Sequence, residues 1–232
     1  MLAVRELHAG YHRDIMILRG VNLEASPGRI TAVLGANGVG KSTLLRTIYG
    51  YLRPSSGSIE LDGTGLLDRA PHDMIELGLA YISQQASVFS HMTVEENLRI
   101  GAWTFKKDSA RISRKLEENF ERFPVLREKR RDKAWMLSGG EQRMVEIGCV
   151  LMTDPKVILV DEPTAGLAKM VAAQVYEMLA RLREEGMTIV LVDQEIRQAL
   201  KIADYVYVLD VGRNRFDGPA AEFSDLEKAF WV

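Results

Sequence analysis

Three segments near the start of the chain combine apolar and polar residues in short runs that are typical of strands. The segments cover residues 2–8, 20–25 and 57–62, and glycine and proline, which favour turns, lie between them. The pattern predicts a small patch of antiparallel strands in the N-terminal part of the chain.

Three further runs are apolar throughout, at residues 29–35, 157–160 and 188–192. Strands without polar alternation are typical of a parallel sheet that is covered on both faces. The first run enters a glycine-rich turn, and a helical pattern begins after it at Lys41. These runs predict an α/β core with a mainly parallel sheet.

Residues 87–153 have a helical pattern instead, with helices expected over 93–103, 108–129 and 138–152. We expect one α/β domain over residues 1–232, which is long enough to bury a full core. In this domain a core lobe, about 1–86 and 154–232, carries an inserted α-helical subdomain at about 87–153.

Composition excludes several classes of function. The formal net charge of −2, from 30 basic and 32 acidic residues, gives no electrostatic case for nucleic-acid binding. The single cysteine, Cys149, excludes an internal disulfide, and its apolar neighbours indicate a small core residue rather than a nucleophile. No apolar run approaches the ~20 residues that span a bilayer, and the N-terminus has no secretory signature. We therefore expect a cytosolic chain that reaches a membrane only through partners.

A glycine-rich turn separates the first buried strand from its helix. It consists of Gly35, Ala36, Asn37, Gly38, Val39, Gly40, Lys41, Ser42 and Thr43. Phosphates need several converging N–H donors, and glycines let the backbone curl around them, while the helix N-terminus adds partial positive charge. We expect this P-loop to bind a nucleotide, with Lys41 at the β- and γ-phosphates and the Ser42 hydroxyl at Mg²⁺.

The apolar run at 157–160 ends in two carboxylates, Asp161 and Glu162. Successive strand residues point to opposite sides, so the two groups can take different roles. We expect Asp161 to hold Mg²⁺ and Glu162 to polarise an attacking water. A strand-end turn with two solvated acids is the alternative, and the preceding P-loop argues against it.

Ser138 precedes the last helical pattern, and Glu141 follows three residues later, which is a capping-box spacing. The capping box does not account for Gly139 and Gly140, because glycines destabilise a first helical turn. Their use would be the close approach of bare N–H groups to an anion. The helix is expected to bury a face formed by Met144, Ile147, Gly148 and Leu151.

In order and spacing, these motifs resemble the ATP-binding subunits of ABC transporters over essentially the whole chain. The matching features are an aromatic residue before the P-loop, the P-loop, Gln84, the signature from Leu137 to Gln142, the acidic strand and a switch strand ending near Gln194. The resemblance implies a head-to-tail dimer that sandwiches two ATP molecules, so that each P-loop faces the signature of the other subunit. The second ATPase subunit would be a copy of this chain or a related protein.

The resemblance also implies roles for single residues. Tyr11 matches the aromatic residue that stacks on adenine, and Gln84 matches the glutamine that contacts Mg²⁺. Ser138, Gly139 and Gly140 would bind the ATP of the partner subunit. Two transmembrane permease subunits and, indirectly, a periplasmic or extracellular substrate-binding protein would complete the assembly at the inner face of the cell membrane.

Two departures from the family pattern narrow the resemblance to one group within the family. Gly166-Leu167-Ala168 lacks the usual aspartate, and Gln194 replaces the usual histidine of the switch strand. Glutamine can donate a hydrogen bond to the γ-phosphate but does not titrate near neutral pH, so we expect Gln194 to position the phosphate. Both departures resemble the ATPase subunits of importers for branched-chain and related hydrophobic amino acids.

Three other functions fit these motifs less well. An ATPase of a lipid or lipopolysaccharide exporter shares part of the pattern, with residues 84–89 and 145–147, but would favour histidine at position 194. A soluble ABC protein of translation or DNA repair generally has two cassettes or a long coiled-coil insertion, and we find neither pattern in this sequence. A plain P-loop kinase or GTPase would lack the signature helix.

Overall fold

The computed structural model describes residues 1–11, 15–85 and 87–223 and divides into two compact units. The core unit comprises Met1–Tyr81, Lys156–Glu162 and Tyr176–Val232, and the helical unit comprises Ile82–Pro155 and Pro163–Val175. The first part of the helical unit thus covers residues 82–155 rather than about 87–153, and residues 163–175, which we expected in the core lobe, also belong to this unit. The expected boundary at residue 86 and the last part of the core lobe, 224–232, lie outside the described residues.

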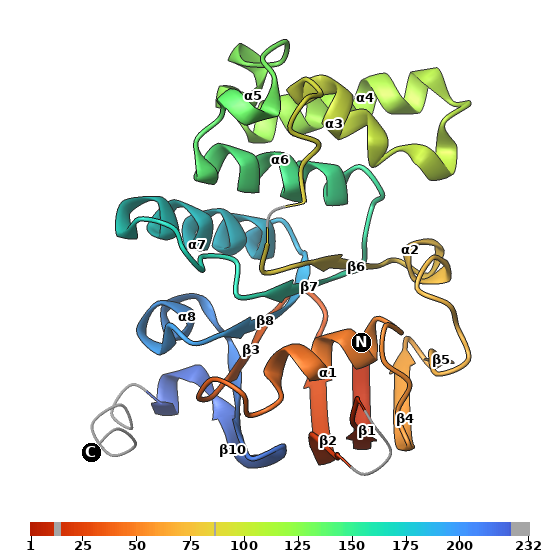
Figure 1. Cartoon of the computed structure of the whole chain (residues 1–232), viewed down its shortest axis with the longest axis vertical. Coiled ribbons are helices and arrows are strands. Elements are labelled where there is room, and N and C mark those ends of the chain that lie inside the picture. The colour runs from red at the N-terminus through yellow and green to blue at the C-terminus, as the bar shows by residue number, and fades with distance from the viewer. Residues whose placement is uncertain (12–14, 86, 224–232) are drawn as a thin grey trace. The chain divides into compact units, whose positions relative to one another are not determined.

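The smaller sheet of the core unit is antiparallel (Figure 1). Its strands lie in the order β2 (Leu18–Ala25), β1 (Leu2–Ala9), β4 (Ser56–Leu61) and β5 (Thr64–Gly65). Both pairings of β1, with β2 and with β4, are antiparallel. The predicted N-terminal patch is therefore confirmed.

The larger sheet of the core unit is mainly parallel. Its order is β10 (Arg213–Pro219), β9 (Tyr205–Asp210), β3 (Ile30–Leu34), β8 (Thr188–Asp193), β7 (Val157–Asp161) and β6 (Leu79–Ile82). Strand β3 pairs in parallel with β8 and β9, β7 pairs in parallel with β8, and β10 is antiparallel to β9. The apolar runs had not indicated β10, because this edge strand is mostly exposed and polar.

Helix α1 (Lys41–Ile48) packs between the two sheets of the core unit. Its buried Leu44, Leu45 and Ile48 share one apolar cluster with residues of both sheets, such as Leu7 of β1 and Val190 of β8. Each such side chain contributes about 1.5–3 kcal/mol by its burial. The P-loop, which precedes α1, is thereby fixed at the carboxyl end of β3. The other helical segments of this unit are α2 (Asp73–Leu77), α8 (Ile196–Ile202), the 3₁₀ turn Ala220–Phe223 and the end of α7 (Lys169–Glu184).

Within its described residues, the helical unit contains four helices and the start of α7. They are α3 (Val94–Ile100), α4 (Ser109–Arg122), α5 (Pro124–Glu128) and α6 (Gly139–Leu151), with 3₁₀ turns at Trp103–Phe105 and Ala134–Met136. A capping box begins α3, because the Thr93 side chain accepts from the Glu96 N–H and Glu96 accepts from the Thr93 N–H.

The helix expected over 108–129 is divided into α4 and α5. Pro124 lacks an N–H and disfavours a helical conformation at the preceding residue, and Phe123 accordingly leaves the helix with φ −124° and ψ 78°. Pro124 then occupies the first turn of α5, where its missing N–H costs nothing.

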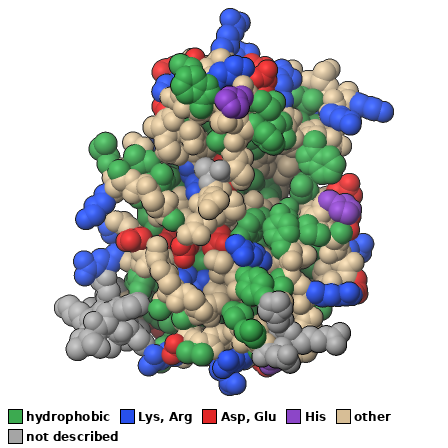
Figure 2. All heavy atoms as spheres, viewed as in Figure 1, with side chains coloured by type: hydrophobic (Ala, Val, Ile, Leu, Met, Phe, Trp, Pro, Cys, Tyr) green, Lys and Arg blue, Asp and Glu red, His purple; other side chains and the backbone are tan. Residues whose placement is uncertain are grey.

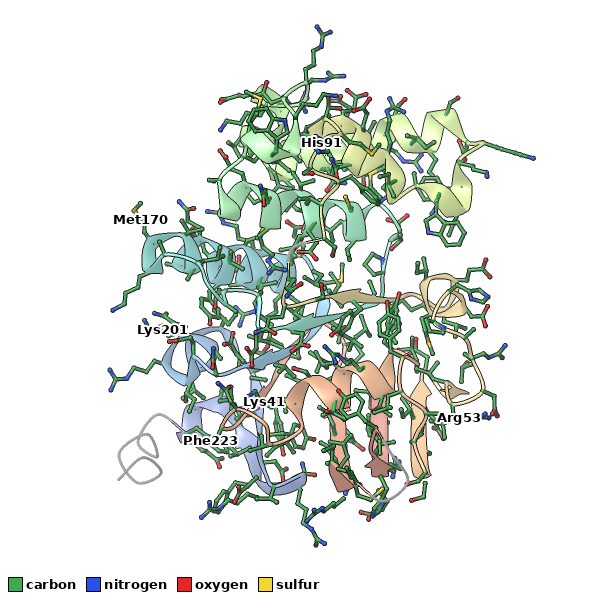
Figure 3. The ribbon with its side chains drawn as sticks, viewed as in Figure 1. Lys41, Arg53, His91, Met170, Lys201 and Phe223 are labelled. Carbon is green, nitrogen blue, oxygen red and sulfur yellow. The ribbon has the colours of Figure 1, made fainter. Side chains whose placement is uncertain are left out.

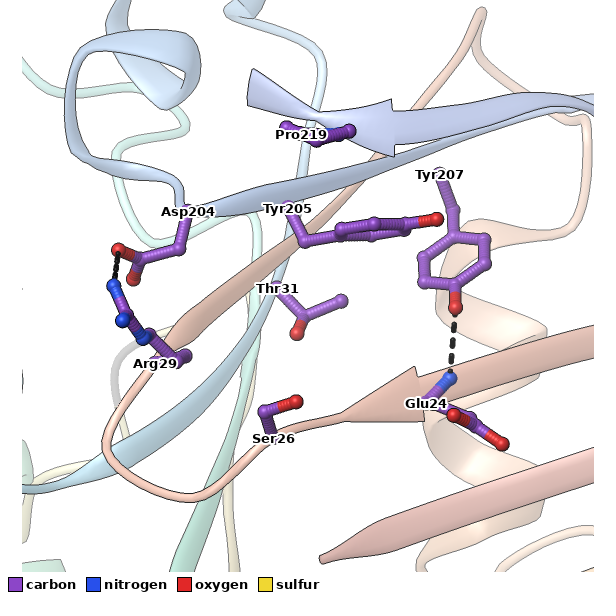
Figure 4. A pocket seen from close by; sticks show the side chains of 8 residues that line it. All are labelled: Glu24, Ser26, Arg29, Thr31, Asp204, Tyr205, Tyr207 and Pro219. Carbon is purple, nitrogen blue, oxygen red and sulfur yellow. Dashed lines mark hydrogen bonds and ion pairs between the residues drawn. The ribbon is translucent and has the colours of Figure 1, made fainter. Parts of the chain in front are cut away.

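A pocket of about 330 Å³ lies in the core unit at the beginning of β3 (Figure 4). Asp204 closes one side of it by accepting from the Arg29 guanidinium at 2.9 Å and from the Ile30 N–H at 2.8 Å. On the other side the Glu24 N–H donates to the Tyr207 hydroxyl at 3.0 Å. The polar groups that line the pocket thus join the start of β3 to the residue before β9, and β2 to β9.

The surface carries charges of both signs. On the face drawn in Figure 2, acidic and basic side chains are interspersed rather than gathered by sign. None of the helices in the described part of the chain has the length and apolarity needed to cross a bilayer.

Candidate functional site

The P-loop connects β3, which ends at Leu34, with α1, which begins at Lys41. Gly40 precedes the helix with φ +111°, and a Cβ at this position would lie 2.9 Å from Leu18 Cδ2. Gly38 has open space around it but a φ of +82°, so its backbone conformation favours glycine. The loop thus has the tight curl that a phosphate cradle requires.

Lys41 lies at the start of α1 (labelled in Figure 3), and only 4% of it is exposed. Its ammonium group donates to the carbonyl oxygens of Gly35 at 2.9 Å and Ala36 at 3.1 Å. The ammonium also lies 3.7 Å from a carboxylate oxygen of Glu162. Lys41 is therefore a buried cation held inside the loop, which suits it to neutralise phosphate charge.

Ser42 and Asp161, which are both predicted to hold Mg²⁺, are joined by a hydrogen bond. The Ser42 hydroxyl donates to Asp161 Oδ1 at 2.8 Å, and the Tyr81 hydroxyl donates to Asp161 Oδ2 at 2.9 Å. Within the described residues no group of three or more His, Cys, Asp or Glu side chains could hold a metal by itself. A single carboxylate beside a hydroxyl fits Mg²⁺, which usually keeps several waters and takes its other ligands from substrate phosphates. Gln84 belongs to the helical unit, so its contact with the same ion stays a prediction.

Glu162 follows β7 but turns away from the strand with a φ of +43°. Its N–H donates to the Val192 carbonyl of β8 at 2.9 Å, and only 9% of the residue is exposed. Burial raises the pKa of Glu162, and the charges of Asp161 and Asp193 add to this, whereas Lys41 lowers it. A carboxylate with a raised pKa is a stronger base, so the environment suits activation of water.

The carboxyl end of β8 carries a buried acid that the sequence analysis did not assign to the site. Asp193 is 1% exposed and accepts hydrogen bonds from the N–H groups of Gln194 and Glu195 and from the Tyr176 hydroxyl. Burial raises the pKa of Asp193, and these hydrogen bonds oppose the shift. The sequence feature that could have assigned Asp193 to the site is an acid at the end of an apolar strand, as for Asp161. Because β8 lies between β3 and β7, the exposed Gln194 stands at the same sheet edge as the P-loop.

Tyr11 is half exposed and lies beside the first turns of α1. Its hydroxyl accepts from Arg46 Nη1 at 3.2 Å and lies 3.5 Å from Thr43 Oγ1. The ring is thus held near the P-loop. Its stacking on adenine remains a prediction.

The signature begins α6 of the helical unit with the predicted capping box. Ser138 Oγ accepts from the Glu141 N–H at 3.3 Å, and Glu141 accepts from the Ser138 N–H at 2.8 Å. Gly139 is exposed, whereas Gly140 is buried, and a Cβ on Gly140 would lie 2.5 Å from Val171 Cγ1. Close packing against the first turn of α7 is therefore a second reason for Gly140, besides approach to an anion.

A buried ion pair joins α6 to the segment around Gln84. Arg143 Nη1 and Nη2 donate to the carbonyl oxygens of Ser83 and Gln84, both at 2.8 Å. Arg143 also pairs at 2.5 Å with Glu146, which accepts from the Ser87 hydroxyl at 2.8 Å. Both charged side chains are almost fully buried. We call this set the Arg143–Glu146 clamp, and within the helical unit it fixes the backbone on both sides of Gln84 to the signature helix.

The rest of α6 agrees with the sequence pattern except at one position. Ile147, Gly148 and Leu151 are buried as predicted, and Met144 is only half-buried. Cys149 donates to the Asn97 carbonyl at 3.1 Å, and burial raises the pKa of its thiol to about 12. The thiol therefore stays protonated, as expected for a packing residue.

A pocket of about 430 Å³ lies within the helical unit, where the Gln84 segment faces the first turn of α6. Its lining includes Gln84, Gly139, Gln142 and Leu167. Within this unit, Gln84, predicted to contact this subunit's Mg²⁺, and Gly139, predicted to bind the partner's ATP, therefore line the same cavity.

Comparison with known proteins agrees with this geometry. Residues 18–165 match the family model described as ABC transporter. The chain is 41% identical over 203 residues to the high-affinity branched-chain amino acid transport ATP-binding protein BraG of Pseudomonas aeruginosa, covering 88% of this chain and 86% of that protein. It is 39% identical to the probable branched-chain amino acid transport ATP-binding protein LivF of Archaeoglobus fulgidus, covering 98% and 96%.

Solved structures show the same fold. One is a nucleotide-free ATP-binding cassette from an ABC transporter, with a TM-score of 0.86 and 27% identity over 99% of this chain and 97% of the other. Another is cbiO1 from Clostridium perfringens, part of the ABC transporter complex cbiONQ, with a TM-score of 0.88 and 31% identity over 98% and 92%. The predicted fold class, a P-loop core with an antiparallel patch and a helical insertion, is confirmed. This chain belongs to the ABC transporter ATP-binding family and is an ATP-binding subunit that couples ATP hydrolysis to transport.

Proposed function

We propose that this chain powers the import of branched-chain or related hydrophobic amino acids. The observation that carries the proposal is its 41% and 39% identity to two relatives named for branched-chain amino acid transport. Relatives named for other cargoes, such as the xylose/arabinose import protein XylG of Sulfolobus acidocaldarius, are less similar, at 30%. Ala168 and Gln194, which depart from the common family pattern, support the same assignment.

The proposed working unit is a head-to-tail dimer bound to two transmembrane permease subunits at the inner face of the membrane. In this dimer the N-terminus of α6, with Ser138, Gly139 and Gly140, would bind the phosphates of the ATP held by the other subunit's P-loop. The exposed Gly139 and the positive end of the α6 dipole support this role. A periplasmic or extracellular binding protein would deliver the cargo.

In the proposed mechanism the core unit positions the γ-phosphate and a water for in-line attack. Lys41 neutralises phosphate charge from inside the loop, and Glu162 accepts or orients the proton of the attacking water. Gln194 donates to the γ-phosphate, and Asp193 fixes the backbone of Gln194. Ser42, Asp161 and Gln84 would hold Mg²⁺, which when bound supplies further neutralisation of the phosphate oxygens.

The assignment of cargo is tested by transport. A tagged form of this chain is purified with its permeases, reconstituted in proteoliposomes with the binding protein, and supplied with ATP. We expect uptake of labelled leucine, isoleucine or valine, and no uptake when Glu162→Gln replaces the parent. ATP-dependent uptake of a sugar, or export of a lipid, without amino-acid uptake would contradict the proposal.

A further inference from the structure

The carboxylate of Asp161 is held at both of its oxygens. Ser42 donates to Oδ1 at 2.8 Å, and Tyr81 donates to Oδ2 at 2.9 Å, while the residue is only 2% exposed. Two donors on opposite oxygens prevent the carboxylate from rotating. The Ser42 contact joins the two predicted metal ligands, whereas the Tyr81 contact has no role in the mechanism above.

Tyr81 is itself held firmly. Its ring packs against Tyr49 and Tyr51, with centroids 5.5 and 5.7 Å away. The Arg46 guanidinium, which donates to the Tyr11 hydroxyl, is also close to Tyr81. A carboxylate can only accept, so the Tyr81 hydroxyl donates its own proton to Asp161.

Tyr81 also stands at a boundary in the chain. It is the last residue of the core unit before the chain enters the helical unit at Ile82, and Gln84 follows three residues later. The Tyr81–Asp161 hydrogen bond thus fixes, within the core unit, the residue from which the chain leaves for the helical unit. The segment that contains Gln84 is held by the Arg143–Glu146 clamp within the helical unit.

We propose that Tyr81 is a positioning residue for the magnesium site, orienting Asp161 so that the oxygen shared with Ser42 can serve the ion. The inference rests on the proposed role of Ser42 and Asp161 in holding Mg²⁺. A tyrosine that merely satisfied a buried acceptor would affect stability, but it would not affect the response to metal selectively.

The test is Tyr81→Phe in a Glu162→Gln background, which removes one hydroxyl and prevents hydrolysis. Binding of a fluorescent ATP analogue is titrated with Mg²⁺ and, in a separate arm, measured in EDTA. We expect the Mg²⁺ concentration at half-effect to rise about tenfold, the change that about 1.4 kcal/mol produces and close to the lower value for a hydrogen bond to a charged group. In EDTA the affinity should stay within about twofold of the parent. Tyr51→Phe, which removes a hydroxyl from the same aromatic cluster but not from Asp161, should change neither quantity.

A second readout, the Mg²⁺ dependence of hydrolysis, does not depend on nucleotide binding by the Glu162→Gln variant. With Glu162 intact, Tyr81→Phe should raise the Mg²⁺ requirement of hydrolysis while kcat at saturating Mg²⁺ stays within about twofold. Equal Mg²⁺ titrations for the variant and its parent, or an equal loss of affinity with and without Mg²⁺, would overturn the role of Tyr81. If the parent itself showed no Mg²⁺-dependent nucleotide binding, the proposed metal site would fail instead.

Discussion

Breaking the Arg143–Glu146 clamp should destabilise the protein far more than breaking a surface ion pair. Glu146→Leu removes the carboxylate that Arg143 contacts at 2.5 Å and leaves a guanidinium that is 3% exposed without its counter-charge. Removing one partner of a buried pair costs about 3–5 kcal/mol. For a chain of this length each kcal/mol lowers Tm by about 2–4 °C, so we expect a fall of about 6–20 °C.

Arg143→Leu should have a different, pH-dependent cost. Burial raises the pKa of Glu146, and the charge of Arg143 lowers it, so without Arg143 the carboxyl takes up a proton more readily. A group whose folded pKa lies above its unfolded value stabilises the fold at low pH and loses this contribution as pH rises through the folded pKa. The penalty of Arg143→Leu should therefore be smaller at pH 5 than at pH 8.

Thermal and urea unfolding of both single variants and the double variant measure the pair directly. The double variant should be more stable than the sum of the single effects predicts, because it leaves no unpaired buried charge. Glu177→Leu is the matched control: it breaks an exposed 2.7 Å pair with Arg181 and should cost less than about 1 kcal/mol. Additivity of the two clamp variants within about 0.5 kcal/mol would refute the reasoning.

Three further predictions concern single positions. Gln194→His should keep ATPase activity and Gln194→Ala should lose it, since the role is donation to the γ-phosphate; a fully active alanine variant would remove that role. Gly140→Ala should lower the free energy of unfolding in urea by about 1–3 kcal/mol, because its Cβ would lie 2.5 Å from Val171. Gly139→Ala, whose Cβ would meet only the flexible end of Leu167 at 3.0 Å, should be nearly neutral. Equal losses of stability would contradict the packing argument. Without nucleotide, Glu162→Gln should gain Tm relative to the parent as pH rises from 4 to 8, because the raised pKa of Glu162 makes its contribution to folding fall over that window; a constant difference would show that Glu162 has no raised pKa.

The sequence predicted those parts of the site that depend on local pattern. The P-loop, the capping box at Ser138 and the acids after β7 each lie within a short stretch, and their chemistry can be read from neighbouring residues. The meeting of Ser42 with Asp161 was also predictable, because parallel strands bring their carboxyl ends to one edge.

Contacts between distant side chains were not predictable in this way. Tyr81 and Asp161 are 80 positions apart, and Ser83 and Arg143 are 60 positions apart. Tyr81 has no local feature that marks it as more than a strand residue. The clamp was likewise hidden because Arg143 and Glu146 lie on a helix whose apolar spacing had indicated only its hydrophobic positions.

The interpretation of Gly140 also changed. From the sequence, the two glycines of the signature had no explanation besides an anion. The structure supplies a packing reason for Gly140 but none of equal force for Gly139, which is exposed at the N-terminus of α6. The anion-binding hypothesis therefore rests mainly on Ser138, Gly139 and the helix end.

The central claim, that the signature of one subunit binds the ATP of another, is tested most directly by trapping the dimer. Glu162→Gln is incubated with ATP and Mg²⁺, and its mass is measured by light scattering; we predict a stable dimer that dissociates without ATP. Adding Ser138→Asp keeps the helix cap but places a negative charge where the partner's phosphates would bind, so this variant should bind ATP and remain monomeric. Ser138→Asn, a neutral residue that also caps helices, should still dimerise. Equal ATP-dependent dimerisation of the Asp and Asn variants would contradict the claim; no dimer at saturating ATP for Glu162→Gln itself would contradict only a dimer of two copies of this chain.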